Sequence, residues 1–167
     1  PLGLVGSEAN LFIVSPYGIS LSTGASFSNV MGLTLTNQTT LPVGTGQFAP
    51  DSSLSEVQLL TGAPSLNLQN SPFSGAPTNY PIEIDGVTIS IDDSLYVHAN
   101  SAFTLNNTSI NSSAGFVSSG DLAVSASDFD NNASISFYTL SDLSVYNSEF
   151  DGNTSLAFDS LGDIDIY

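Results

Sequence analysis

The sequence SDFDNNASISF at residues 127–137 returns 21 positions later, at residues 148–158, as SEFDGNTSLAF. The aromatic and acidic positions agree between the two copies, so that Phe137, for example, corresponds to Phe158. A repeat of about 20 residues is typical of solenoids, in which each repeat buries its apolar face only by stacking on its neighbours. The repeat therefore restricts the chain to a stacked, quasi-one-dimensional architecture.

Short alternating apolar pairs occur within each repeat, such as Ile135 with Phe137 and Leu143 with Val145, and Ser, Gly, Asp or Asn separates them. Alternation with a period of two indicates short strands, and the intervening residues are those of turns. No segment keeps helical spacing, and Ser, Thr, Asn and Gly are poor in helix interiors. We therefore predict an all-β fold, a right-handed parallel β-helix (β-solenoid) with three short strands per coil and coils of about 19–21 residues.

The step between equivalent residues differs between successive repeats. Val97 precedes Phe116 by 19 residues, whereas Phe116 precedes Phe137 by 21, and the two extra residues enter at one corner, between Phe129 and Ile135. In a stack of coils, equivalent inward residues form ladders at roughly the 4.8 Å spacing of strands. Five aromatic residues are accordingly predicted to be core stacks: Phe116, Phe129, Phe137, Phe150 and Phe158.

The regularity divides the chain into three parts. Residues 1–36 are predicted to be β-helix coils, residues 37–80 irregular loops or an extra-helical hairpin, and residues 81–167 regular coils. The middle part holds five of the eight prolines, which favours loops. The chain begins without an initiating Met or a signal peptide and ends within a coil, so we expect it to be a piece of a longer polypeptide whose coils continue.

The charge composition excludes two classes of partner. The chain has no Lys or Arg against 16 Asp and Glu, a formal charge of −16. Without cations it cannot neutralise phosphates, so we expect no nucleic-acid partner, and binding to anionic lipid is disfavoured. No apolar run reaches transmembrane length, so we expect no membrane insertion.

Residues 9–35 differ from the later coils. Within them the sequence SPYG reads as a tight turn between strands LFIV and ISL, because Pro16 fixes φ and Gly18 can take a positive φ. Asn10 can hydrogen-bond at a turn or stack in an internal ladder. These residues also fit a purely structural role at the corners of coils.

This stretch resembles the haemagglutination-activity domain of filamentous-haemagglutinin-type exoproteins, which use two-partner secretion. Ser15 replaces the usual Asn, Leu21 and Ser22 replace Phe and Gly, and the specific match covers about 30 of 167 residues, in the C-terminal part of that domain. The matching residues are Asn10, Phe12, Pro16, Gly18, Ile19, Ala25, Phe27, Val30 and Gly32.

The resemblance implies a secreted structural or adhesive exoprotein segment. It implies an outer-membrane two-partner-secretion transporter as partner and an extracellular location, on the surface of a Gram-negative or cyanobacterial cell. An open stack of strands also offers unpaired backbone at each end, and a high net charge keeps lateral faces apart. We therefore expect a rod or fibre, with end-to-end self-association as one way to build it.

An enzymatic function is an alternative, because β-helices include glycan-cleaving enzymes. Lyases of this kind need a cation at the uronate, and hydrolases need paired carboxylates with supporting groups. Asp92, Asp93 and His98 are the nearest approach, and His98 follows the inward Val97, so it is predicted to face solvent. We predict no catalytic residues and no enzyme activity. The alternative is the non-catalytic part of a pectate-lyase-like or tailspike-like enzyme.

The acidic positions suggest one possible metal. The residues after Asp128 fail the EF-hand pattern, but the repeat stacks Asp128 on Glu149 and Asp130 on Asp151 along one edge. Carboxylates about 5 Å apart repel by roughly 1 kcal/mol even in water, and solvent Ca²⁺ would relieve this. A weak calcium ladder and a solvated acidic face both remain open, and no other cofactor is predicted. Ice binding through Thr34 and Thr36 ranks last, because no Thr array repeats.

Overall fold

The computed structural model describes residues 2–3, 9–28, 30–38, 41–43, 46–48, 78–130 and 134–167. In these ranges every regular element is a β-strand. Three parallel sheets run along the molecule and make up the coils of a β-solenoid. The predicted all-β solenoid is confirmed, with about five turns of about 21 residues each.

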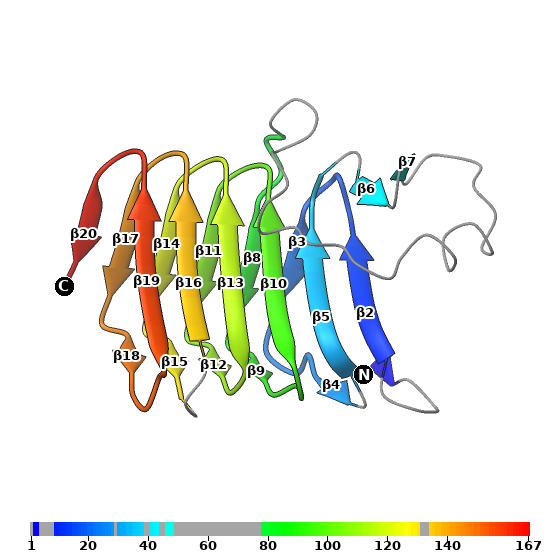
Figure 1. Ribbon diagram of the computed structural model, residues 1–167, viewed down its shortest axis with the longest axis horizontal. Helices are drawn as coiled ribbons and strands as arrows, with labels where there is room; N and C mark the ends of the chain where they lie inside the picture. The colour runs from blue at the N-terminus through cyan, green and yellow to red at the C-terminus, as the bar shows by residue number, and fades with distance from the viewer. Residues whose placement is uncertain are drawn as a thin grey trace.

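The longest strands form one sheet, here called the long sheet, which lies toward the viewer in Figure 1. Its strands follow one another in parallel along the solenoid axis. They are β2 (Ala9–Val14), β5 (Val30–Thr36), β10 (Ser94–Ala99), β13 (Ser113–Ser118), β16 (Ser134–Thr139) and β19 (Ser155–Ser160).

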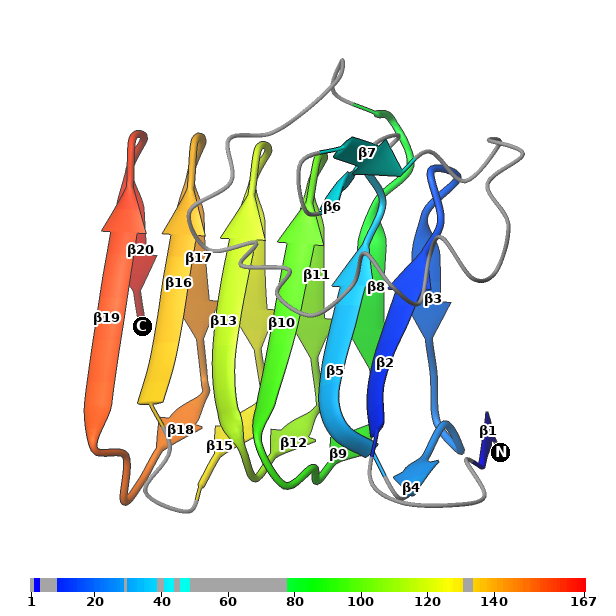
Figure 2. The same ribbon diagram turned by 45° about the vertical axis from the view of Figure 1, so that its right-hand side comes forward.

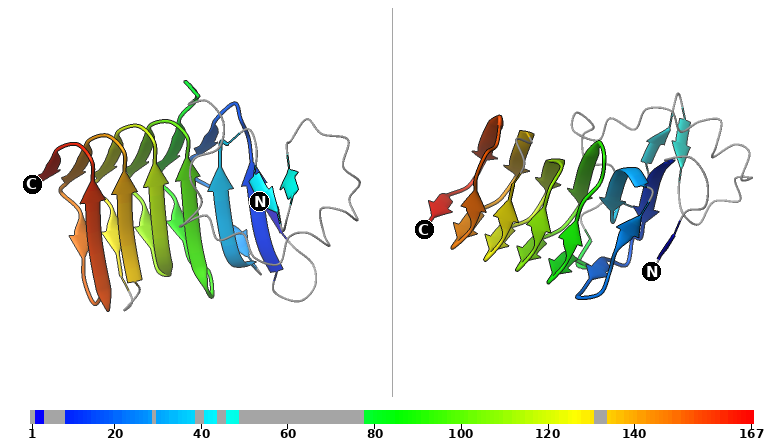
Figure 3. Two further views of the ribbon diagram at one scale, coloured as in Figure 1. Left: turned by 45° about the horizontal axis from the view of Figure 1, so that its top comes forward. Right: turned by 90° about the horizontal axis from the view of Figure 1, so that it is seen from below.

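Two further parallel sheets complete the coil. The second sheet lies behind the long sheet and consists of β3 (Ile19–Leu21), β8 (Ile82–Asp85), β11 (Phe103–Asn106), β14 (Leu122–Ser125), β17 (Leu143–Tyr146) and β20 (Ile164–Ile166). The short sheet runs along the lower side, as Figures 2 and 3 show, and consists of β9 (Thr88–Ile89), β12 (Ser109–Ile110), β15 (Asp128–Phe129) and β18 (Glu149–Phe150).

Each regular coil runs from the long sheet to the second sheet, then to the short sheet and back to the long sheet. In Figure 1 the chain rises through β10 in front, descends through β11 behind and returns below through β12 to β13, one position toward the C-terminus. This path winds to the right, the hand that parallel crossovers adopt because strands twist to the right. The three strands of a coil are the three that the sequence predicts.

The strand register confirms both repeat steps. Val97 pairs with Phe116 and Ile110 with Phe129, a step of 19. Phe116 then pairs with Phe137, a step of 21. The change falls at the corner between β15 and β16, as predicted, part of which lies outside the described residues.

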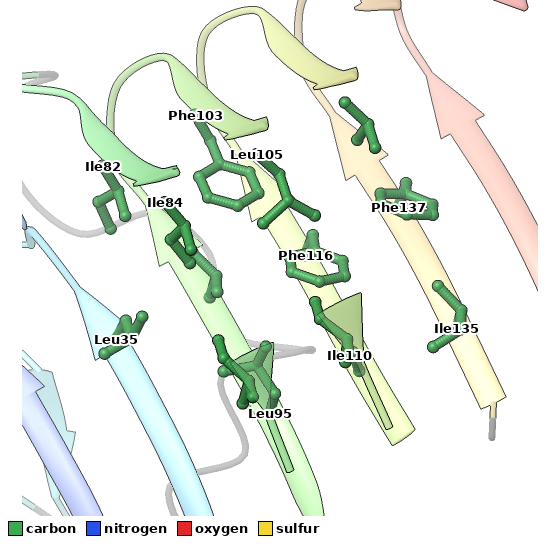
Figure 4. Close-up of a cluster of buried hydrophobic side chains, with 14 of the residues drawn as sticks. Leu35, Ile82, Ile84, Leu95, Phe103, Leu105, Ile110, Phe116, Ile135 and Phe137 are labelled. Carbon is green, nitrogen blue, oxygen red and sulfur yellow. The ribbon is translucent and has the colours of Figure 1, made fainter. Parts of the chain in front are cut away.

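The core consists of the inward residues of all three sheets. Figure 4 shows Leu95, Phe116 and Phe137 pointing into the coil from the long sheet, toward Phe103 and Leu105 on the second sheet. The predicted aromatic ladders are present: Phe137 stacks on Phe116 at 5.0 Å and on Phe158 at 5.3 Å between ring centroids, and Phe150 stacks on Phe129 at 4.7 Å. Phe150 and Phe158 are half-buried, because they belong to the last coil.

Serine and threonine at the corners satisfy backbone groups that strands leave unpaired. At the end of successive long-sheet strands, Ser118 Oγ donates to the carbonyl of Ser101, Thr139 Oγ1 to that of Gly120, and Ser160 Oγ to that of Ser141. A buried carbonyl without a partner would cost free energy comparable to a lost hydrogen bond. The Ser- and Thr-rich composition therefore has a structural cause at the corners.

Two small pairings lie beside the three sheets. β1 (Leu2–Gly3) pairs in parallel with β4 (Phe27–Ser28). β6 (Leu41–Val43) and β7 (Gly46–Phe48) form an antiparallel pair within the part predicted to hold loops or an extra hairpin. Most of the remainder of that part lies outside the described residues. β5 pairs directly with β10, so the coils that precede residues 37–80 and the coils that follow them form one stack.

Candidate functional site

The predicted SPYG turn connects β2 to β3. The backbone N–H of Gly18 donates to the carbonyl of Ser15 at 3.1 Å, and Gly18 has a φ of +87°. A Cβ at this position would lie 2.7 Å from the carbonyl oxygen of Pro81. Only glycine readily combines a positive φ with this close approach, because it has no Cβ. The Pro16–Gly18 part of the family-like motif thus shapes a corner that packs on the next coil.

Asn10 and Gly32, the two ends of the motif, meet on adjacent strands. Asn10 pairs in register with Gly32, and a Cβ on Gly32 would lie 2.7 Å from Asn10 Oδ1. Asn10 precedes Leu11, which packs against the core, so its side chain faces outward and the alternative of an internal amide ladder is wrong. Ile19 is buried and pairs with Ile82, while Phe12 is half-buried and pairs with Thr34. All these contacts place the motif residues in structural positions of the first two coils.

Asn37 forms a buried junction that the sequence did not indicate. Its amide nitrogen donates to the carbonyl of Tyr80 and to Ser101 Oγ, both at 2.7 Å, and its Oδ1 accepts from the backbone N–H of Asn100 at 2.7 Å. Asn37 is fully buried. It therefore ties the residue that follows β5 to residues 80, 100 and 101. No local sequence pattern indicates this role, because the hydrogen-bond partners lie 43 to 64 residues away in the sequence.

His98 is buried, so the prediction that it faces solvent is wrong. Alternation does point its side chain away from the coil interior, but Gln38 lies against it, and His98 is only 1% exposed. The amide nitrogen of Gln38 lies 2.7 Å from His98 Nδ1. Burial lowers the pKa of His98 from its usual 6.5 to about 4, since the charged ring would be desolvated. The ring is therefore neutral at pH 7.

The acidic edge lies on the outer side of the short sheet. Asp128 pairs in register with Glu149, and the pairing of Phe129 with Phe150 brings Asp130 and Asp151 to equivalent positions. All four carboxylates are exposed. Nowhere in the described ranges do three or more His, Cys, Asp or Glu side chains form a group suited to holding a metal ion. The predicted ladder is thus present as pairs of acids on a solvated edge.

Calcium binding at this edge stays a prediction, which a melting experiment tests. If Ca²⁺ binds between Asp128 and Glu149, millimolar Ca²⁺ should raise the melting temperature, because a ligand that binds only the folded state stabilises it. Asp128→Asn with Glu149→Gln should abolish the rise, and Glu83→Gln, an exposed acid on the second sheet, should leave it unchanged. An equal rise with Mg²⁺ would show general screening of charge. No rise with Ca²⁺ would show that calcium does not bind at this edge.

Asp92 and Asp93 lie apart from His98 in the structure, and Thr34 and Thr36 face no solvent. Asp92 and Asp93 are exposed, whereas His98 is buried and lies four residues beyond the start of β10, roughly 13 Å along a strand. The structure therefore does not bring these three together as acid, base and support. Thr34 and Thr36 are buried, and Thr36 Oγ1 donates to the carbonyl of His98 at 2.8 Å. They offer no threonine surface to ice.

The fold defines the chain as a parallel β-solenoid whose described surface is acidic. Within the described residues, no helix has the length and apolar character needed to cross a membrane. Comparison with known proteins gives no match to a family model, to a curated protein or to a solved structure.

Proposed function

We propose that the chain is a rod-forming segment of a secreted structural or adhesive surface exoprotein, exported by a two-partner route. Further copies of the chain extend the stack at β19 and β20, and the rod projects from the cell. The sequence resemblance at residues 9–35 supports the export route, and the fold supports the rod.

The last coil carries the observation on which the rod rests. β19, β20 and β18 each form the edge of their sheet, so one side of each strand has no strand partner among the described residues. Leu156, Ile164 and Ile166 occupy inward positions but are 41%, 44% and 57% exposed. Their counterparts one coil earlier, Ile135, Leu143 and Val145, are at most 2% exposed. An edge with exposed apolar residues in register is a template for another coil.

The charge distribution supports growth along the axis over lateral clustering. With 16 acids and no Lys or Arg, the sides of neighbouring rods repel one another, whereas the inward positions at the end are apolar. Backbone hydrogen bonds and apolar stacking at the end are short-range and are screened little by salt. Addition of a coil at the end is therefore the association that this surface favours.

Sedimentation velocity and electron microscopy test the rod. At physiological salt we expect the sedimentation coefficient to rise with concentration and the particles to lengthen in one direction. Ile164→Asp combined with Ile166→Asp places charges at the apolar end and should keep the chain monomeric. Asp165→Ser changes the outward position on the same strand and should assemble like the parent chain.

Three results would contradict the proposal. The first is a parent chain that stays monomeric up to its solubility limit, and the second is an Ile164/Ile166 variant that assembles as the parent does. The third is clear depolymerisation of a polyanionic glycan by the chain, which would favour an enzyme.

The export route is tested separately. Surface labelling of intact producing cells should disappear when the partner transporter is deleted, while a periplasmic marker is unchanged.

A further inference from the structure

A groove lies on the outer face of the long sheet. It has a volume of about 330 Å³ and is lined by side chains from β10, β13, β16 and β19 together with Asp93. Its cause is a column of outward positions in which Tyr96 is followed by Gly115, Ser136 and Ala157. Because the three residues after Tyr96 are small, the surface falls away next to its ring.

A serine ladder runs along the same groove. The first residues of the four strands are in register, and all four line the groove: Ser94, Ser113, Ser134 and Ser155. The backbone N–H of Ser134 donates to Ser113 Oγ at 3.3 Å, which places these two residues of the ladder next to each other across the strands.

Ser94 lines the groove from a nearly buried position. The residue is only 8% exposed, but Ser94 Oγ is not one of the buried side-chain atoms that lack a hydrogen-bond partner, which among the described residues are Ser112 Oγ and Asn153 Oδ1. Because Ser94 lines the groove, a water or a ligand in the groove can hydrogen-bond to its hydroxyl group.

The chemistry of the lining selects a class of ligand. Serine hydroxyls both donate and accept hydrogen bonds, and the Tyr96 ring offers an apolar face beside them. Among the described residues of the lining Asp93 is the only charged one, and the chain has no Lys or Arg to pair with a carboxylate, sulfate or phosphate. An anionic ligand is therefore disfavoured, and a ligand rich in neutral hydroxyl groups is favoured.

The repetition of the lining selects the shape of that ligand. The same hydroxyl recurs in four successive coils at roughly the 4.8 Å strand spacing, along the solenoid axis. A ligand that lies along the groove meets the same donor and acceptor repeatedly, which suits an extended polymer of like units. We propose that this groove binds an uncharged glycan chain, with its first sugar against Tyr96 and Ser94. The inference holds whether or not the chain forms rods, so its failure leaves the proposed rod intact.

Titration calorimetry with neutral oligosaccharides tests the groove. The probes are cellohexaose, xylohexaose and maltohexaose, with an oligogalacturonate as the anionic control, and the protein is the full chain. We expect at least one neutral probe to bind. Ser136→Phe fills the groove and Tyr96→Ala removes the ring, and each should weaken that binding by about tenfold or more. Ser144→Phe makes the same change at an exposed position of the second sheet and should bind like the parent chain.

The outcomes separate cleanly when circular dichroism shows that the variants are folded. Binding of a neutral probe that both groove variants weaken supports the proposal. The proposal is overturned if no neutral probe binds, if only the oligogalacturonate binds, or if Ser136→Phe and Tyr96→Ala bind as tightly as the parent chain. If Ser136→Phe does not fold, Tyr96→Ala decides alone, because it only removes atoms from a half-buried side chain.

Discussion

Replacing Phe137 with Ala should lower the free energy of unfolding by about 3–5 kcal/mol, the cost typical of removing a buried phenylalanine. Phe137 is 1% exposed and lies between the stacked rings of Phe116 and Phe158. Its ring also makes edge-to-face contacts with Phe129 and Phe150, with ring centroids 5.6 Å and 6.0 Å apart. Removing this one side chain therefore leaves a cavity shared by three coils. Equilibrium urea denaturation followed by circular dichroism measures the change.

Tyr138→Ala is the matched control for this prediction. Tyr138 is the next residue on β16, but its side chain faces outward and is half-buried, so its loss should cost about 1 kcal/mol or less. Because a solenoid coil depends only on its neighbours, Phe137→Ala should also expose residues 155–167 to limited proteolysis first. Equal losses for the two variants would show that the phenylalanine ladder does not carry the stability of these coils.

Acidification from pH 7 to pH 4 should cost the fold about 3 kcal/mol through His98 alone. Burial holds the pKa of His98 at about 4, against 6.5 in the unfolded chain. Above pH 6.5 both states are neutral at this residue, and the residue contributes no pH dependence. Between pH 6.5 and 4 the unfolded chain binds a proton that the folded chain does not, so stability falls with falling pH. Each pKa unit of difference corresponds to about 1.4 kcal/mol.

His98→Gln isolates this effect from the titration of the carboxylates. The variant retains a polar side chain opposite Gln38 but carries no titratable group. The paired neighbours of His98, Thr36 on β5 and Val117 on β13, do not titrate either. The difference in unfolding free energy between parent and variant should therefore change by about 3 kcal/mol between pH 7 and pH 4. A constant difference across this range would mean that His98 is accessible to protons in the folded state.

The coils could be predicted in detail because their information is local and repeated. The period of two gives the direction of each side chain, and equivalent residues such as Val97, Phe116 and Phe137 stack because hydrogen bonding between parallel strands fixes the register. The acidic pairs could be predicted in the same way, since Asp128 precedes the inward Phe129 and Glu149 precedes the inward Phe150. Each of these positions needed only the repeat and the alternation.

The buried polar contacts could not be predicted, because they join residues far apart in the sequence. Asn37 and Gln38 reach residues 80 to 101 across a segment with no repeat, and only the folded chain shows that they do. Alternation correctly pointed His98 outward, but whether an outward side chain meets water depends on what else packs there.

The sequence alone thus determined the strands, the coils, their register and the inward ladders, since these follow from local periodicity. The tertiary structure decided which outward positions are covered, as at His98, and which are hollow, as beside Tyr96. The physical reason is that exposure of an outward residue depends on the volume of its neighbours in other coils and on segments that return over the sheet. Neither of these is encoded in the residue's own place in the repeat.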